Sequence, residues 1–143
     1  MTIMPLAKDQ LPAACDLILR TFLRFEAPDY GPEGTETFCT FLDTPQEMEA
    51  LAFYGAFCKG VLRGVIAMRG RGHIALFFVE EGWQRRGIGR ALFRRALGDA
   101  PPGRITVNAS PAGLPAYLKL GFFPMGEEQT ADGMRFTPMG YLP

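Results

Sequence analysis

The residues best suited to chemistry lie in one short stretch, Gln84–Arg90, which reads Gln-Arg-Arg-Gly-Ile-Gly-Arg. Its two glycines, Gly87 and Gly89, have no Cβ atom, so a ligand could approach the backbone N–H groups closely. Its arginines carry guanidinium groups that bind phosphate oxygens through paired hydrogen bonds. The stretch therefore predicts a binding site for a phosphate-bearing anion.

Two elements must hold such a turn in place, and the flanking sequence predicts both. The apolar run His73–Val79 is rich in aromatic and β-branched residues, which favours a buried strand. After the turn, Ile88, Leu92 and Ala96 recur at helical spacing. A turn between a strand and a helix start leaves backbone N–H groups free for an anion. An ordinary strand–turn–helix without a ligand remains the alternative.

Two common phosphate-binding motifs do not fit this turn. The nucleoside-triphosphate loop needs Gly-x-x-x-x-Gly-Lys-Ser/Thr, which is absent. The dinucleotide fingerprint needs a third glycine and an acidic residue about 20 residues later. This chain has no third glycine, and the later region offers Val107 and Asn108 instead.

The pattern that remains, Gln-x-x-Gly-x-Gly over Gln84–Gly89, resembles the acetyl-CoA loop of the GNAT (Gcn5-related N-acetyltransferase) family. In that family the backbone amides of this loop hold the CoA pyrophosphate. The resemblance implies an acetyl-CoA-dependent N-acetyltransferase with acetyl-CoA as cosubstrate. The cofactor-binding residues that it implies are Phe78, Val79, Gln84, Arg85, Arg86, Gly87, Ile88, Gly89, Arg90 and Asn108.

The second half of the chain adds to this resemblance. Asn108, followed by Tyr117-Leu-Lys-Leu-Gly121-Phe122, is similar to the family's Asn…Tyr-x-x-x-Gly-Phe segment. The resemblance implies that two parallel strands, Ile74–Glu80 and Arg104–Ala109, splay apart after a bulge and take the pantetheine arm between them. No glycine or bulge is visible inside the first of these strands, so the splay rests on the resemblance alone.

The chemistry of acetyl transfer assigns roles to a few residues. Attack of an amine on a thioester passes through an oxyanion, which a backbone N–H near Val79 could stabilise. Tyr117 occupies the family's acid position and would protonate the leaving thiolate, and Glu80 is the candidate base or proton relay. The alternatives are a core tyrosine packed on Phe122 and an exposed acidic turn. A cysteine nucleophile is a rival mechanism, but none of the three cysteines has a nearby signature.

Charge is unevenly distributed, and this suggests where the acceptor binds. Residues 1–58 carry three basic and nine acidic side chains, a net charge of −6, whereas residues 59–104 carry ten basic and three acidic ones, a net charge of +7. An acidic first third and a basic middle favour an amine and a polyanionic cofactor as partners. Solvated surface charge is the alternative. The candidate acceptor residues are Phe25, Glu26, Asp29 and Tyr30, close to Glu33 and Glu36.

Composition excludes several other classes. The 143 residues suit one GNAT domain over 1–143, and zero net charge gives no overall attraction to nucleic acid or membrane. No apolar run reaches the roughly 20 residues that cross a bilayer. Cys15, Cys39, Cys58 and the single histidine make no metal-site pattern, so no metal is predicted. The N-terminus does not read as a signal peptide, and the cytoplasm is the expected location.

The expected fold class is α+β, with a mixed, mostly antiparallel central sheet and about four helices, as in the GNAT family. The expected strands are Thr2–Leu6, Leu51–Cys58, Val61–Arg69, Ile74–Glu80, Arg104–Ala109, Phe122–Gln129 and Met134–Tyr141, with turns at Gly70–Gly72 and Asp132-Gly133. The expected helices cover Leu11–Phe25, Glu33–Leu42, a short segment after a Thr44 cap, Ile88 to about Gly98, and Ser110 to Gly121.

The sequence leaves the acceptor open between a small amine, a peptide N-terminus, a lysine and an aminoglycoside. It also leaves open the general base, a preference for another acyl group, and assembly into a homodimer. The alternative function is a non-catalytic acyl-CoA-binding sensor.

Overall fold

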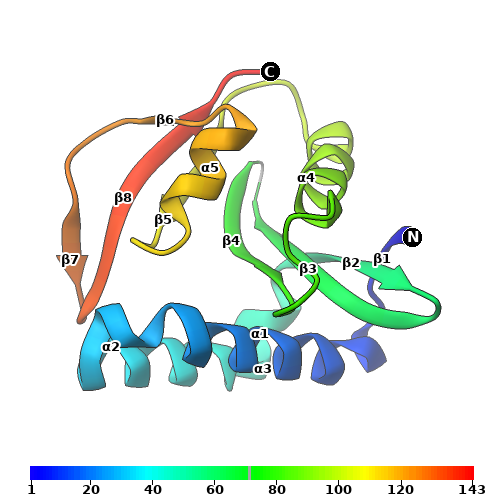
Figure 1. Ribbon diagram of the computed structural model, residues 1–143, viewed down its shortest axis with the longest axis horizontal. Helices are drawn as coiled ribbons and strands as arrows, with labels where there is room; N and C mark the ends of the chain where they lie inside the picture. Colours follow the sequence, from blue (N-terminus) through cyan, green and yellow to red (C-terminus); the bar gives the residue numbers. More distant parts are fainter. Residues whose placement is uncertain (71) are drawn as a thin grey trace.

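A computed structural model describes residues 1–70 and 72–143, so Arg71 of the expected Gly70–Gly72 turn lies outside the described residues. The strands form one mixed sheet in the order β1-β2-β3-β4-β5-β8-β6, with β7 paired to β8 (Figure 1). Among the strands of the described residues, β4 and β5 are the one parallel pair, and the other pairs are antiparallel, as predicted. The strand bounds are β1 Thr2–Pro5, β2 Ala52–Cys58, β3 Val61–Arg69, β4 His73–Val79, β5 Ile105–Ala109, β6 Phe123–Pro124, β7 Gln129–Ala131 and β8 Met134–Tyr141.

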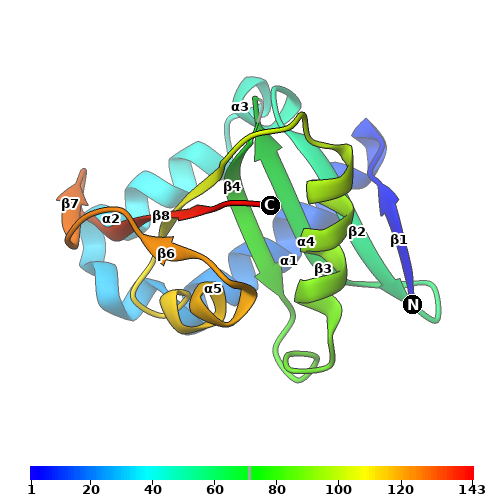
Figure 2. The same ribbon diagram turned by 90° about the horizontal axis from the view of Figure 1, so that it is seen from above.

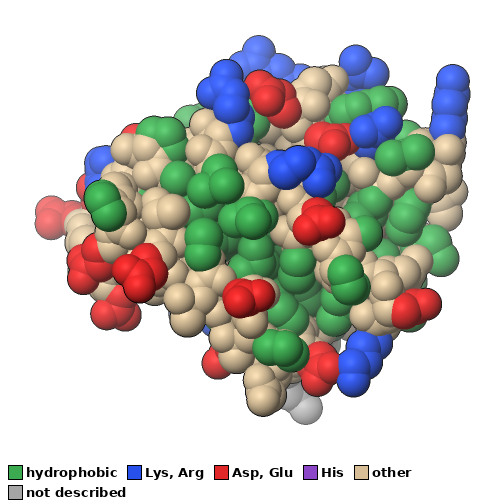
Figure 3. Space-filling model, turned by 90° about the horizontal axis from the view of Figure 1, so that it is seen from below, with side chains coloured by type: hydrophobic (Ala, Val, Ile, Leu, Met, Phe, Trp, Pro, Cys, Tyr) green, Lys and Arg blue, Asp and Glu red, His purple; other side chains and the backbone are tan. Residues whose placement is uncertain are grey.

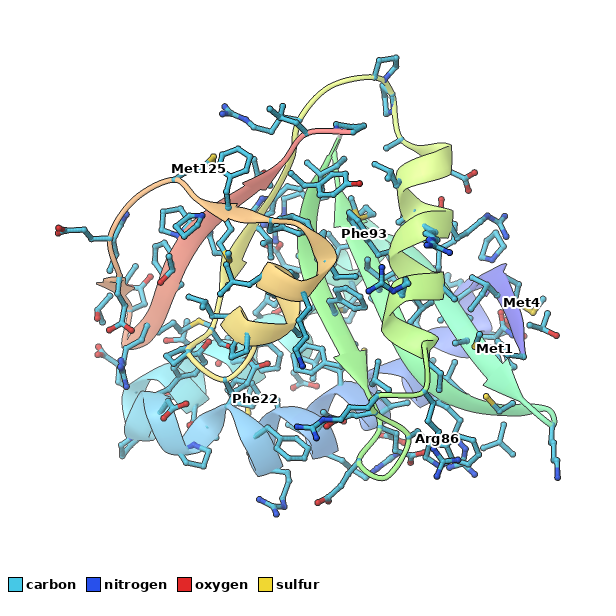
Figure 4. All side chains as sticks on the ribbon, turned by 45° about the horizontal axis from the view of Figure 1, so that its top comes forward. Met1, Met4, Phe22, Arg86, Phe93 and Met125 are labelled. Carbon is cyan, nitrogen blue, oxygen red and sulfur yellow. The ribbon has the colours of Figure 1, made fainter. Side chains whose placement is uncertain are left out.

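The helices cover both faces of this sheet and so create two cores. The helices α1, α2 and α3 pack on one face, while α4 and α5 pack on the other (Figures 1 and 2). Phe22 and Phe93, labelled in Figure 4, belong to the first and second core respectively. The helix bounds are α1 Leu11–Phe25, α2 Ala27–Leu42, α3 Pro45–Glu49, α4 Ile88–Asp99 and α5 Leu114–Leu120, and a 3-10 turn, η1, covers Lys8–Gln10.

Two helix starts and one capping interaction differ from the sequence-based expectation. The helix α2 begins at Ala27 rather than Glu33, because Gly31 adopts a φ of 72° and lets two helical segments meet at a kink. The Thr44 hydroxyl does not cap α3; it donates to the carbonyl of Thr40 at 2.6 Å. The helix α5 begins at Leu114, four residues after Ser110, whose Oγ still accepts a hydrogen bond from the backbone N–H of Gly113 at 3.0 Å.

The expected strand Phe122–Gln129 is also interrupted, leaving the short strands β6 and β7 on either side of a loop. The β7–β8 hairpin does turn at Asp132-Gly133, where both residues have positive φ angles of 52° and 79°. Two successive positive φ angles define the tight turn that matches the twist of a hairpin.

The strands β4 and β5 pair over only two positions, His73 with Thr106 and Ile74 with Val107. Beyond these positions the strands diverge, as Figure 2 shows. A bulge accompanies the divergence: Ala67 pairs with Leu76 and Met68 with Ile74, which leaves Ala75 as an extra residue in β4. A bulge bends a strand and increases its local twist. The splay is therefore present, and its bulge lies at a residue that carries no sequence signal.

Candidate active site

A cleft of about 670 Å³ lies where β4 and β5 separate. Its walls come from α1, α2, β4, the turn before α4, β5 and α5. Six consecutive residues of β4, Ile74–Val79, contribute to the walls. Small-molecule sites occupy roughly 300–1,000 Å³, so this cleft can take a ligand of substantial size.

The glycine turn forms one end of the cleft. Gly87 is the N-cap of α4 and has a φ of 84°, a conformation that side chains rarely adopt. Gln84 ties the turn to the end of β4, because its Nε2 donates to the carbonyl of Val79 at 3.0 Å. Gln84, Arg85, Gly87, Gly89 and Arg90 all line the cleft. The free N–H groups of the first turn of α4 therefore lie beside two cleft-lining arginines.

A stack of side chains supports this turn from outside the cleft. The guanidinium carbon of Arg63 lies 4.4 Å from the centre of the Trp83 ring, and that of Arg86 lies 4.8 Å from the same ring. Arg63 reaches this position because it is the extra residue of a bulge in β3, where Ala56 pairs with Gly64 and Phe57 with Leu62. Figure 4 labels Arg86 on the loop that precedes α4. Trp83 thus contacts two cations.

Glu80 belongs to this support rather than to the cleft wall. Its two carboxylate oxygens accept hydrogen bonds from Arg20, at 3.0 Å, and from Arg63. Burial acts to raise the pKa of Glu80, but the bonds from Arg63 and Arg20 outweigh it and lower the pKa below the usual value. A carboxylate held in its charged form by two arginines is a poor proton acceptor.

Tyr117 places its ring against the cleft from α5. Its ring meets Phe77 edge-on, with centroids 5.9 Å apart, and Phe122 edge-on at 5.4 Å. The residue is buried and also lines the cleft, so the packing role and the chemical role are compatible. Burial raises the pKa of Tyr117, and the nearby Glu26 and Tyr30 raise it further. The hydroxyl therefore stays protonated throughout the neutral range.

Glu26 lies at the other end of the cleft, at the junction of α1 and α2. Burial is the largest influence on the pKa of its carboxyl group and raises it. Hydrogen bonds with the Ser110 and Tyr30 hydroxyls lower this pKa, and the charge of Asp29 raises it, so that the pKa is about 7. A group with such a pKa exchanges its proton readily near neutral pH. Strongly shifted pKa values in a cleft are typical of functional sites.

The β7–β8 hairpin closes this end against α2. A Cβ atom on Gly34 would lie 2.3 Å from the carbonyl oxygen of Gly133, so only glycine allows the two backbones to approach this closely. The Thr37 hydroxyl donates to the carbonyl of Asp132 at 2.7 Å. We call these two contacts, Gly34 with Gly133 and Thr37 with Asp132, the hairpin latch. The latch holds the hairpin on α2, and Met134 of β8 lines the cleft beside it.

The predicted site residues divide into two groups. Four do not line the cleft. Glu80 and Arg86 belong to the supporting stack, Ile88 is buried in a core, and the carbonyl of Asp29 accepts a hydrogen bond from Arg135 at 3.4 Å. The remaining residues meet in one cleft: Phe25, Glu26, Tyr30, Phe78, Val79, Gln84, Arg85, Gly87, Gly89, Arg90, Asn108 and Tyr117.

Several wall residues were missed by sequence reasoning. Lys119 adds a third cation to the walls, and its position inside the Tyr117–Phe122 segment was the available signal. Thr21, Phe38, Ser110 and Met134 come from four separate segments and carry no local motif.

The cleft is therefore polarised. Among its described wall residues, the cations Arg85, Arg90 and Lys119 face a single carboxylate, that of Glu26. Figure 3 shows the same contrast on a larger scale, with acidic side chains gathered over the α2 and β7 end and basic ones over the side of the turn before α4. Such a field draws an anion and a cation to different ends of one cleft.

Within residues 1–70 and 72–143, no cluster of three or more histidine, cysteine, aspartate or glutamate side chains could hold a metal ion. Across those residues, no helix combines the length and the apolar character that crossing a membrane requires.

Comparison with known proteins gives a family match over most of the chain. Residues 26–142 match the family model described as "Acetyltransferase (GNAT) domain". Among curated protein sequences, none matches the chain significantly.

Several solved structures match over nearly the whole length at low sequence identity. A GCN5-related N-acetyltransferase from Rhodopseudomonas palustris superimposes with a TM-score of 0.86 at 19% identity, over 99% of this chain and 95% of that one. The PaiA N-acetyltransferase from Thermoplasma acidophilum, in complex with coenzyme A, gives 0.75 at 16% identity, with both chains covered completely. A ribosomal-protein-alanine N-acetyltransferase from Brucella melitensis gives 0.65 at 16% identity, with 100% coverage of both. At these identities the likeness shows a shared fold.

Proposed function

Because the chain belongs to the GNAT acetyltransferase family, we propose that it transfers the acetyl group of acetyl-CoA to the nitrogen of an amine acceptor. One observation carries this proposal: a single cleft joins the glycine turn to Tyr117 and Glu26 through the gap between β4 and β5. The phosphate-binding end and the end suited to an amine are thus connected by a passage that two strands leave open.

The turn Gln84–Arg90 would hold the CoA pyrophosphate. Its backbone N–H groups lie at the start of α4, where the helix dipole favours an anion. Arg85 and Arg90, and Lys119 on α5, add positive charge to the walls of the cleft. Asn108, at the exposed end of β5, would form hydrogen bonds with the pantetheine amides. The supporting stack around Trp83 would keep the turn in place before the ligand arrives.

The backbone of Val79 is the candidate oxyanion donor. The N–H of Glu80 donates to the carbonyl of Arg63 on β3 at 2.9 Å. Because neighbouring residues of a strand direct their N–H groups to opposite sides, the N–H of Val79 points away from β3, toward the gap. The Val79 carbonyl also points away from β3, since it accepts the hydrogen bond from Gln84. This orientation supports stabilisation of the oxyanion that forms at the thioester carbonyl.

Tyr117 would act as the general acid. Its protonated hydroxyl can give a proton to the thiolate of CoA when the C–S bond breaks. Its position on α5, opposite β4, supports this role, because the thioester must reach β4 for the oxyanion to meet Val79.

Release of free thiol from acetyl-CoA in the presence of an amine tests the proposed function. We expect amine-dependent thiol release and an acetylated product of matching mass. An acyl-CoA-binding sensor would bind acetyl-CoA in calorimetry and release no thiol with any amine, and that result would exclude the proposal.

A further inference from the structure

The end of the cleft around Glu26 is mostly apolar. Phe25, Tyr30, Phe38, Phe78 and Met134 contribute to its walls. The ring of Phe38 is fixed in place, because it stacks on Phe22 with centroids 3.9 Å apart and meets Phe78 edge-on at 6.0 Å. The aromatic wall is therefore part of a packed core and cannot easily rearrange around a polar ligand.

Glu26 is the one acidic group among the described cleft residues. The neighbouring acids Glu33 and Glu36 are exposed on α2 and do not line the cleft. Among the ion pairs of the described residues, none includes Glu26. The nearby cation Arg135 instead pairs with Glu128 at 3.2 Å. The site thus offers one carboxylate without a cationic partner, set in aromatic walls.

This inference rests on the proposed function and gives the acceptor a chemical class. We propose that the acceptor is a small primary amine with one positive charge on an apolar body, and that Glu26 receives the proton that this amine loses before it attacks.

The walls favour a single charge over several. One ammonium group can pair with Glu26 while the apolar body packs on the aromatic rings. A second or third ammonium, as in a polyamine or an aminoglycoside, would be desolvated against these rings without a partner, which is unfavourable. The cleft therefore selects against polycations.

The proton balance assigns one transfer to each acid–base group. The ammonium group gives one proton to the Glu26 carboxylate, and the neutral nitrogen attacks the thioester carbonyl. The N–C bond forms and the C–S bond breaks. Tyr117 gives its proton to the thiolate sulfur and takes back the surplus proton of the attacking nitrogen. Glu26 then releases its proton to water, so the products are the amide, free CoA and one proton.

Every charged or titratable neighbour of Glu26 influences this transfer. Asp29 and Tyr30 face it from α2, Tyr117 faces it from α5, and Arg135 lies beyond Asp29 and Tyr30 on β8. With its pKa near 7, Glu26 is charged above neutral pH and is then able to accept a proton. The value of kcat/KM should therefore rise with pH and reach a plateau above about pH 7.

The first experiment compares amines with the wild-type protein. The probes are 2-phenylethylamine and n-hexylamine against spermidine, kanamycin and a peptide with a free N-terminal alanine. We expect kcat/KM to be at least about tenfold higher for the two apolar monoamines, the range that contacts in an apolar pocket supply. Equal or better transfer to spermidine, kanamycin or the peptide would overturn the substrate class.

The second experiment compares Glu26→Gln with Glu36→Gln, which removes the same charge from an exposed site on α2. We expect Glu26→Gln to lower kcat by about 100-fold or more and to remove the rise of the pH profile near 7. Acetyl-CoA affinity should stay unchanged in both variants. A Glu26→Gln protein with the wild-type pH profile would overturn the role of Glu26. Binding of acetyl-CoA without transfer to any amine would instead reject the proposed function itself.

Discussion

The two ends of the cleft are built in different ways. The end proposed to bind phosphate comes from one continuous segment, the end of β4 and the turn before α4, and would use mainly backbone N–H groups. The end proposed to bind the acceptor is assembled from the α1–α2 junction, the β7–β8 hairpin and the segment around Ser110, and would use side chains. Backbone geometry is constrained by the fold, whereas these side chains can be exchanged without altering it. The difference explains how one fold can keep its cofactor and still take different acceptors.

The strongest way to break the phosphate-binding end is to place a negative charge in it. Gly87→Glu would strain a residue with a φ of 84° and direct a carboxylate into the open space beside the turn. We expect acetyl-CoA binding to be abolished in calorimetry while circular dichroism shows a folded protein.

Two controls separate charge from strain in that experiment. Gly98→Glu adds the same side chain to α4 at a position with nothing within 4 Å of the new Cβ. Gly87→Ala adds the strain without the charge. Unchanged affinity in a folded Gly87→Glu variant would show that the phosphates bind elsewhere.

The next largest effect concerns Tyr117, which lies where the two ends of the cleft meet. Tyr117→Phe keeps the ring contacts with Phe77 and Phe122 and removes only the hydroxyl. We expect kcat to fall by about 100-fold to 10,000-fold, the usual contribution of a general acid, while acetyl-CoA affinity is retained. Tyr141→Phe is the matched control, because Tyr141 packs on Phe93 and Phe122 outside the cleft. A wild-type kcat, with chemistry shown to limit the rate, would leave water as the proton donor.

A smaller effect distinguishes support of the turn from catalysis. Glu80→Gln removes the charge that holds Arg63 and Arg20, so Arg63 should pack less well on Trp83. Loss of about 1 kcal/mol of hydrogen-bond energy would weaken acetyl-CoA binding about fivefold. The KM for the amine should not change in Glu80→Gln. In the control Glu81→Gln, both the acetyl-CoA affinity and the KM for the amine should stay unchanged, because the ion pair of Glu81 with Arg24 is exposed. A large fall in kcat with unchanged acetyl-CoA affinity would instead support Glu80 as the base.

The last prediction concerns the stability of the acceptor end rather than acetyl transfer. The pKa of Glu26 is raised from 4.5 to about 7 in the folded chain, so the folded state binds the proton more tightly than the unfolded state does. Its contribution to stability is fully present below about pH 4.5 and is lost as pH rises through about 7. Glu26→Gln should therefore melt about 10 °C higher than the wild type at pH 8 and at the same temperature at pH 4. Calorimetric melting at both pH values checks this, and a less stable variant at pH 8 would contradict it.

The sequence predicted the turn end of the cleft better than the acceptor end. The turn Gln84–Arg90 could be identified because its strand, glycines and helix are adjacent in the chain, so a local pattern is enough. The bulge at Ala75 could not, since it depends on the register between β3 and β4, which no single segment encodes. The start of α2 was misplaced because Gly31 joins two helical segments that a pattern search separates.

The acceptor end was only partly accessible from the sequence. The charge pattern brought Glu26 and Tyr30 into consideration, and both line the cleft, but it could not distinguish them from Asp29, which does not. Phe38 and Met134 become neighbours only through the hairpin latch between Gly34 and Gly133. Contacts between distant segments carry no local signal. The catalytic and binding roles of these residues stay predictions until the variants are measured.

The hairpin latch has a mechanical consequence. The two halves of the sheet, β1–β4 and β5–β8, are joined directly by the short parallel pairing, and α2 joins them a second time through the latch. In Figure 1, β7 and the start of β8 meet α2 at the lower left, and β4 and β5 lie nearer the middle of the molecule. The two halves of the sheet are thus connected at two separate places, and we expect these connections to limit how far the halves can separate.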